Sequence, residues 1–212
     1  MDGGVSSPAL VLAAGLSRRM GRFKLTLPWG ATTVIGQVLA TLAAAAVAEI
    51  VVVTGHRDAE VADAVRAAGI AARCVHNPRY ASGEMLSSIQ AGLAALEPAE
   101  GRPAALLCLG DQPQMQVATV RAVLAAGAAA NWQRVIIPSH NMRAGHPVLL
   151  PRSLWPAILA ADDNLRRVLA DHRAMVEYLT VNSPSILADL DTPEDYERGR
   201  HAHEPPVQPD AA

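Results

Sequence analysis

The amino-acid sequence predicts a three-layer α/β sandwich, in which helices cover both faces of one mostly parallel β-sheet. First, short apolar runs of strand length alternate along the chain with longer segments of helical periodicity. Second, these apolar runs are continuous, as expected for strands that are buried on both faces. Third, the 212 residues contain no internal repeat and no interior linker, which favours one domain with a sizeable core.

The composition narrows the classes of function. Half of the residues are apolar but only 3% are aromatic, so the core must consist mainly of Ala, Val, Leu and Ile. A net charge of −2 argues against nucleic acid or an anionic membrane surface as a partner, and polar residues interrupt the Ala-rich stretches, so no membrane span is expected. Cys74 and Cys108 lie in strand-like runs without metal-ligand spacing, which predicts two buried, reduced thiols in a cytoplasmic protein.

The N-terminal half of the chain starts with residues 1–8, which we expect to be flexible. The elements predicted after them are a strand at 9–14, a helix at 33–46, a strand at 49–54, a helix at 58–68, a strand at 72–76, a helix at 85–96 and a strand at 104–109. Thr32 or Thr33 is suited to cap the first of these helices. Gly69 stops the second helix, and Asn77-Pro78 closes the third strand.

The C-terminal half continues the alternation with shorter elements. They are a helix at 117–126, strands at 134–138 and 146–150, helices at 153–160 and 164–170, strands at 176–181 and 186–188, and a final helix at 193–200. Residues 201–212 are polar and Pro-rich, so we expect a disordered tail. The single folded domain is therefore predicted to span residues 9–200.

Four residues directly follow predicted strands, and they are Gly15, Gly55, Asn77 and Asp111. If these strands are parallel, all four residues lie on the same rim of the sheet. Open α/β sheets bind their ligands in the crevice outside the carboxyl ends of the strands. The pattern therefore predicts a ligand site on this rim.

The segment 10–24 is the most informative stretch of the chain. An apolar run ends in a small-residue turn, and Gly15 and Gly21 allow the backbone to approach a ligand closely. Hydroxyl and basic side chains follow, and they are Ser17, Arg18, Arg19, Arg22 and Lys24. This order is typical of a loop that binds phosphates, although the spacing matches neither a P-loop nor a dinucleotide fingerprint. The alternative is a surface turn with solvated basic side chains.

The order of residues in this loop resembles the signature Leu-Ala-Ala-Gly-x-Ser-x-Arg-Met-Gly-x-x-Lys of the MobA-like nucleotidyltransferases, and among them of the molybdenum cofactor cytidylyltransferases. Every fixed position is filled, by Leu12, Ala13, Ala14, Gly15, Ser17, Arg19, Met20, Gly21 and Lys24. The resemblance extends to about Arg198. It implies a Rossmann-like sheet of the glycosyltransferase-A-like kind, with nucleotide bound by Leu12, Ala13, Ala14, Gly15 and Ser17. It also implies that Arg19 and Lys24 hold the triphosphate and stabilise developing charge as catalytic residues.

Two acidic motifs are candidates for binding Mg²⁺. Gly110-Asp111-Gln112-Pro113 follows a buried strand, and a carboxylate there is well placed to hold the ion, although it also suits a tight turn. The resemblance gives Asp111 the role of catalytic metal ligand. In residues 189–196 the same resemblance points to Asp191 as the second ligand, with Asp189 the less favoured candidate. The alternative for Asp191 is a cap on the last helix.

Two further motifs resemble substrate-binding elements of the family. The first contains Asn77, Gly83 and Ser87, which the resemblance assigns to the nucleotide, and Ser88, which it assigns to the acceptor. An ordinary loop and helix cap remains the alternative for the two serines. The second contains His146, which is expected to contact the acceptor unless its role is structural. The run 141–144 departs from the Gly- and Arg-rich stretch common before this histidine in the family.

These resemblances imply a Mg²⁺-dependent enzyme that transfers CMP from CTP to the terminal phosphate of molybdopterin. The products would be molybdopterin cytosine dinucleotide and pyrophosphate, and the implied recipient is a molybdoenzyme of the xanthine dehydrogenase type. The preference for CTP depends on Ala14, because the guanylyl-transferring relatives more often have Gly there. A transferase that uses GTP or another phosphorylated acceptor, and a non-catalytic carrier of a nucleotide-bearing pterin, are the alternatives. An intact set of Lys24, Asp111 and Asp191 argues against the carrier.

Overall fold

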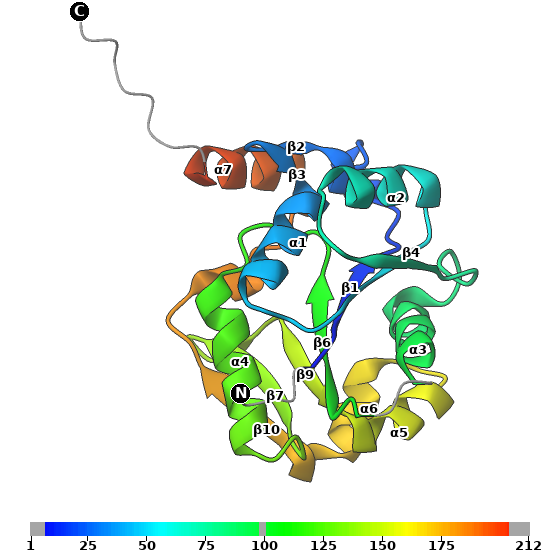
Figure 1. Ribbon diagram of the computed structural model, residues 1–212, viewed down its shortest axis with the longest axis vertical. Helices are drawn as coiled ribbons and strands as arrows, with labels where there is room; N and C mark the ends of the chain where they lie inside the picture. Colours follow the sequence, from blue (N-terminus) through cyan, green and yellow to red (C-terminus); the bar gives the residue numbers. More distant parts are fainter. Residues whose placement is uncertain (1–6, 98–100, 204–212) are drawn as a thin grey trace, which may run out of the picture.

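A computed structural model describes residues 7–97 and 101–203 of the protein. An eight-stranded sheet forms its centre, with the strand order β10-β7-β9-β6-β1-β4-β5 and β8 paired with β7 (Figure 1). In chain order the strands are β1 (Ala9–Ala13), β4 (Ile50–Thr54), β5 (Arg73–His76), β6 (Ala104–Leu109), β7 (Val135–His140), β8 (Arg143–Ala144), β9 (Val148–Pro151) and β10 (Val176–Thr180). Strand β9 is antiparallel to β6 and β7, β8 is antiparallel to β7, and the other pairs are parallel. The prediction of a mostly parallel sheet is thus confirmed.

Helices cover both faces of this sheet. They are α1 (Val34–Ala44), α2 (Asp58–Ala67), α3 (Glu84–Leu96), α4 (Val117–Ala129), α5 (Trp155–Ala160), α6 (Leu165–Asp171) and α7 (Pro193–His203). A small hairpin of β2 (Pro28–Trp29) and β3 (Thr32–Thr33) precedes α1, whose first turn is capped by the Thr33 side chain as it accepts a hydrogen bond from the Gly36 amide. Among the helices of the described ranges, none is long and apolar enough to cross a membrane.

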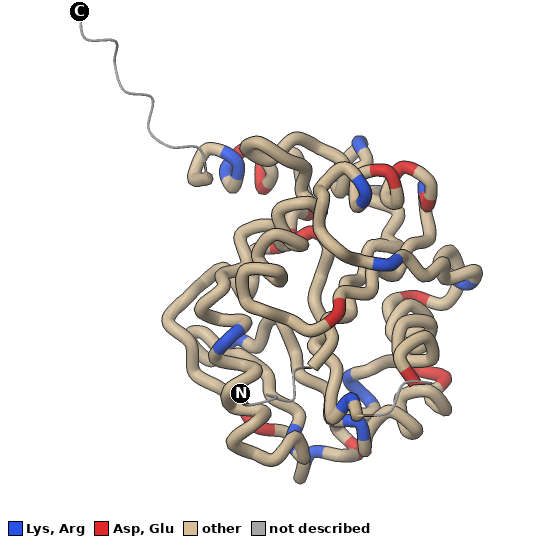
Figure 2. The backbone as a smooth tube through the Cα atoms, viewed as in Figure 1, with Lys and Arg blue, Asp and Glu red and all other residues tan. Residues whose placement is uncertain are grey.

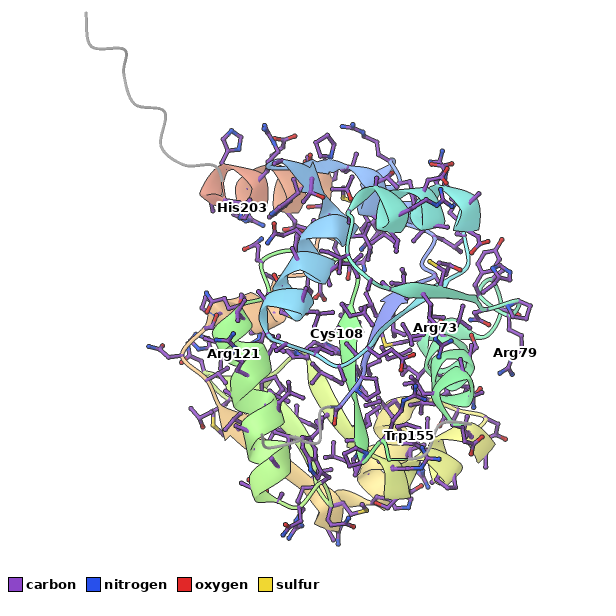
Figure 3. All side chains as sticks on the ribbon, in the orientation of Figure 1. Arg73, Arg79, Cys108, Arg121, Trp155 and His203 are labelled. Carbon is purple, nitrogen blue, oxygen red and sulfur yellow. The ribbon has the colours of Figure 1, made fainter. Side chains whose placement is uncertain are left out.

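Two apolar layers fix the helices to the sheet because successive strand residues point to opposite faces. Helices α1, α2 and α4 pack on residues such as Val11 and Cys108, whereas α3, α5 and α6 pack on residues such as Leu10 and Leu107. Figure 3 shows Cys108 within β6 and Trp155 at the start of α5, where its Nε1 donates to the Leu150 carbonyl at 3.1 Å. Charged residues lie mainly on the helices and loops around the strands (Figure 2). The sheet is therefore a rigid, apolar base for the loops at its ends.

The neighbouring strands β6, β1, β4 and β5 run in the same direction, so their carboxyl ends share one rim. Backbone hydrogen bonds join the segments that leave these ends: the Gly110 amide donates to the Leu12 carbonyl at 2.9 Å, and the Asn77 amide to the Thr54 carbonyl at 2.9 Å. The predicted convergence of the four residues that follow these strands on one rim is confirmed.

Two local predictions are wrong. Residues 186–188 are not a strand; a 3₁₀ helix spans Pro184–Leu187, because Pro184 lacks an amide donor and the Ser183 side chain accepts from the Ser185 amide. Cys74 is exposed rather than buried, because β5 is an edge strand that pairs with β4 alone, whereas Cys108 is buried as predicted.

The ends of the folded chain also differ from the prediction. Ser7 and Pro8, expected to be flexible, are buried, and the Pro8 carbonyl accepts a hydrogen bond from the Leu106 amide at 2.8 Å. Helix α7 extends through residues 201–203, which were expected to belong to the disordered tail. The other residues of the two predicted flexible segments, 1–6 and 204–212, lie outside the described ranges.

Candidate active site

A cleft of about 410 Å³ lies on the rim formed by the carboxyl ends of β1 and β6. Its walls come from the loop after β1, the start of α3, the end of β6 and the segment before α7. Many of the predicted site residues line this cleft, and they are Leu12, Ala13, Ala14, Gly15, Ser17, Arg19, Lys24, Ser88, Asp111 and Asp191. The structure thus brings together residues from four distant parts of the sequence.

The loop after β1 is held in a fixed, compact conformation. Ser17 and Gly21 both have positive φ, at 50° and 61°, and they flank a 3₁₀ turn over Arg18–Met20. The Ser17 hydroxyl accepts a hydrogen bond from the Lys24 amide at 3.4 Å. Met20 is buried with Trp29 and Leu190, which joins the loop to the segment before α7. This packing aims Arg19 and Lys24 into the cleft.

Lys24 is the centre of the charged end of the cleft. Its Nζ contacts the Asp111 carboxylate, lies 3.6 Å from Asp191 Oδ1 and donates to the Leu190 carbonyl at 2.9 Å. Arg19 forms an ion pair with the other oxygen of Asp191 at 3.0 Å. The Lys24 and Asp111 side chains are only 13% and 19% exposed, so solvent screens this contact less than a surface ion pair. Two carboxylates from distant segments therefore converge on one cation.

The same carboxylates suit a divalent metal ion, since oxygen ligands are those that Mg²⁺ prefers. Their convergence on the ammonium of Lys24 shows that positive charge is stabilised between Asp111 and Asp191. Within the described ranges, His, Cys, Asp and Glu side chains nowhere form a group of three or more that would hold a metal by itself. An ion bound here would complete its coordination with water and substrate phosphates, the usual arrangement for Mg²⁺.

Asp189 is a third carboxylate on the wall of the cleft. Partial enclosure by the cleft wall raises the pKa of its carboxyl group, and the negative charges of Asp111 and Asp191 raise that pKa further. The Gln112 side chain opposes this shift, because its Nε2 donates to Asp189 Oδ1 at 2.6 Å. The family resemblance favours Asp191 over Asp189, but the two residues are only two positions apart, and this spacing is the sequence signal that places Asp189 at the same site.

Three of the residues predicted to bind nucleotide do not line the cleft but support its wall. Asn77 is buried; its Nδ2 donates to the hydroxyls of Ser87 and Ser88 at 2.8 and 3.0 Å, and its Oδ1 accepts from the Arg79 amide. Gly83 leaves room for Ser87, because a Cβ at position 83 would lie 2.4 Å from the Ser87 Cβ. The network positions Ser88, which does line the cleft.

His146 also does not line the cleft, although its imidazole interacts electrostatically with the Asp111 carboxylate. Its amide donates to the Ile186 carbonyl at 3.1 Å. Burial lowers the pKa of its imidazole to about 4, and the nearby Asp111 carboxylate opposes this shift only in part. His146 is therefore neutral at neutral pH.

This depressed pKa predicts a loss of stability in acid. Between the ordinary histidine pKa near 6.5 and the folded value of about 4, the unfolded chain binds a proton that the folded chain does not. Stability contributed by neutral His146 is present above pH 6.5 and falls by about 3 kcal/mol as the pH drops to 4. Urea unfolding at several pH values measures this, and His146→Asn should flatten the dependence in that window. An unchanged slope in the variant would contradict the assignment.

Sequence patterns did not predict several residues that line the cleft, which are Leu16, Leu25, Tyr80, Glu84, Met85 and Leu109. Tyr80 is the largest of them, and its ring lies 6.3 Å from the ring of His56 and 6.2 Å from that of His76. Gly55 makes room for it, because a Cβ at Gly55 would lie 2.5 Å from the Tyr80 Cβ and 2.8 Å from the Ala14 Cβ. An aromatic residue between Asn77-Pro78 and Gly83, in a chain poor in aromatics, is the signal that was available.

A mostly parallel α/β sheet that presents a glycine turn, a basic loop and paired carboxylates at one cleft fits an enzyme of the nucleotidyltransferase class. The chain belongs to the MobA-like NTP transferase domain family, whose model matches residues 9–176. It is 30% identical over 191 residues to the molybdenum cofactor cytidylyltransferase of Escherichia coli strain K12, an alignment that covers 88% of this chain and 92% of the relative.

Solved structures support the same fold. A nucleotidyl transferase from Methanothermobacter thermautotrophicus superposes with a TM-score of 0.78 at 26% identity, covering 93% of this chain and 97% of that one. A Mycobacterium tuberculosis protein in complex with manganese gives a TM-score of 0.70 at 27% identity, covering 93% and 99%. The fold is therefore the glycosyltransferase-A-like fold of the nucleotidyltransferases, as the sequence predicted.

Proposed function

We propose that the protein transfers CMP from CTP to the terminal phosphate of molybdopterin, forming molybdopterin cytosine dinucleotide and pyrophosphate. The observation that carries this proposal is the convergence of Arg19, Lys24, Asp111 and Asp191 at one end of the cleft, with the turn at Ala14 lining the same cleft. The similarity to a cytidylyltransferase along most of the chain supports both the donor and the acceptor.

In this reaction an oxygen of the acceptor's terminal phosphate attacks the α-phosphorus of CTP. The new P–O bond forms as the bond to the β-phosphate oxygen breaks, and pyrophosphate leaves with the bonding electron pair. The attacking oxygen is already anionic, so no side chain has to act as nucleophile or general base. Catalysis then consists of positioning the two phosphates and neutralising their charge.

Basic and acidic residues of the cleft have different roles in binding the phosphates and neutralising their charge. Arg19 and Lys24 bind phosphate oxygens and stabilise the charge that develops on the leaving pyrophosphate. Asp111 and Asp191 would hold Mg²⁺, which when bound supplies a Lewis acid for the phosphate oxygens. The hydrogen bond from Lys24 Nζ to the Leu190 carbonyl, at 2.9 Å, holds the ammonium beside these carboxylates.

The base of the nucleotide would lie at the end of the cleft formed by Ala13, Ala14 and Gly15. Ala14 is largely buried, and the methyl group that distinguishes it from glycine narrows the backbone surface offered to the base. Tyr80 packs beside Ala14 across Gly55 and offers an aromatic edge or face at the same end. On this proposal the product would pass, in the cytoplasm, to a molybdoenzyme of the xanthine dehydrogenase type.

Pyrophosphate release with Mg²⁺ and molybdopterin, measured in turn with CTP, GTP, ATP and UTP, tests the proposal. Release with CTP and little with the other nucleotides is the expected result. Release mainly with GTP would overturn the base preference and leave the transfer chemistry in place. A folded protein that binds a nucleotide but releases no pyrophosphate would overturn molybdopterin as the acceptor, or enzymatic activity altogether.

A further inference from the structure

Gln112 directly follows Asp111, and its side chain is buried at the junction of two segments that carry the charged end of the cleft. Its Nε2 donates to Asp189 Oδ1 at 2.6 Å and to the Ile186 carbonyl at 3.3 Å. One residue earlier, the Asp111 carbonyl accepts a hydrogen bond from the Leu190 amide at 3.2 Å. The end of β6 is thus joined to the segment before Asp191 by side-chain and backbone bonds together.

The orientation of the Gln112 side-chain amide pairs its nitrogen but leaves its oxygen unpaired. With Nε2 turned to Asp189, the Oε1 atom is buried without a hydrogen-bond partner among the described residues. The opposite orientation would turn Oε1 toward the Asp189 carboxylate and the Ile186 carbonyl, where two acceptors would repel it. Buried carbonyl groups are rarely left unpaired, so the unpaired Oε1 indicates that the bonds of Nε2 to Asp189 and Ile186 set the orientation of this side chain.

The same junction includes the segment that carries His146. The Ile186 carbonyl accepts hydrogen bonds from both the Gln112 side chain and the His146 amide. Gly145 permits this approach, because a Cβ there would lie 2.2 Å from the Ile186 carbonyl oxygen. Three segments therefore meet at Ile186, and among their side chains Gln112 is the one that reaches both the Ile186 carbonyl and Asp189.

We infer that Gln112 is a positioning residue that clamps the segment bearing Asp191 against the strand end bearing Asp111, and so sets the spacing of the two carboxylates for a divalent cation. The inference rests on the proposed function, in which these carboxylates bind that cation. Asp111 and Asp191 lie on different segments, so the contacts between these segments, together with the bridge through Lys24, fix their separation. Groups that orient metal ligands in this way typically change metal affinity by 10- to 100-fold when they are removed.

The test is the dissociation constant for Mn²⁺, measured by calorimetry on the full chain without nucleotide. We expect Gln112→Met, which keeps length and apolar bulk but cannot donate, to weaken Mn²⁺ binding about tenfold. The matched control is Gln90→Met, since Gln90 is also a buried glutamine whose Nε2 donates to the carbonyls of Ile158, Leu159 and Ala161. That variant should lower the melting temperature yet leave Mn²⁺ affinity within twofold of the wild type.

Asp189→Ala removes the acceptor of the same hydrogen bond together with one negative charge of the cleft wall, and Gln112→Leu, which also cannot donate, serves if Gln112→Met does not fold. If the clamp acts through Asp189, each single variant weakens Mn²⁺ binding about tenfold and the double variant no further. Unchanged Mn²⁺ affinity in folded Gln112→Met, or in Asp189→Ala, would overturn the inference, as would fully additive losses in the double variant. A wild-type protein that fails to bind Mn²⁺ would instead contradict the metal site of the proposed function.

Discussion

Asp111→Asn is expected to lower turnover on the order of 10³-fold while the protein remains folded. The substitution keeps the size of the side chain but removes the negative charge that faces Lys24 and would bind the metal. An amide oxygen is a weaker ligand for a hard divalent cation than a carboxylate, so the phosphates lose most of their charge neutralisation. The loss should appear in kcat, because the charge develops in the transition state.

Pyrophosphate release under saturating nucleotide measures this effect, and circular dichroism with thermal unfolding checks the fold. The matched control is Asp63→Asn, which removes an exposed carboxylate that pairs with Arg66 on α2, away from the cleft. That control should keep wild-type turnover. Turnover of Asp111→Asn within tenfold of the wild type would show that this carboxylate is a turn residue only.

Lys24→Met is expected to lower turnover by a similar factor, on the order of 10³-fold, for a different reason. The variant retains both carboxylates but loses the ammonium that would bind the triphosphate. Because that ammonium neutralises Asp111 and Asp191, its removal also frees them for another cation. Mn²⁺ binding measured without nucleotide should therefore become tighter, although the enzyme is impaired.

The opposite responses of turnover and metal affinity distinguish this effect from general damage to the site. Calorimetric titration with Mn²⁺ and the pyrophosphate assay are made on the same preparation. Arg66→Met, which removes an exposed cation on α2, is the control and should change neither quantity. Weaker Mn²⁺ binding in Lys24→Met would mean that the lysine supports the carboxylates rather than competing for them.

Much of this site follows from local sequence patterns. Continuous apolar runs identify buried parallel strands, and parallel strands bring the residues after their ends to one rim. Glycine and basic residues after β1 then indicate where phosphate binds, and Asp111 follows from its place after β6. The second carboxylate, Asp191, follows instead from the resemblance of residues 189–196 to a family motif, because its position before Thr192-Pro193 alone suits a helix cap equally well.

Other features depend on contacts that local patterns do not encode. The exposure of Cys74 follows from the position of β5 at the edge of the sheet, and strand order is a property of the whole fold. The supporting role of Asn77 and the clamp at Gln112 follow from side chains that meet across the chain. Short apolar runs such as residues 186–188 suit both a strand and a helical turn, so Ser183 and Pro184 decided that element.

Lys24 is the only lysine in these 212 residues, and its Nζ is enclosed by two carboxylates and a backbone carbonyl. Amine-directed reagents therefore have a single side-chain target, which lies at the phosphate end of the cleft. The labelled fraction of the peptide that contains Lys24 therefore reports the fraction of molecules in which the cleft holds no ligand. The same property makes lysine coupling unsuitable for attaching the protein to a surface, since every side-chain linkage formed in this way would block the cleft.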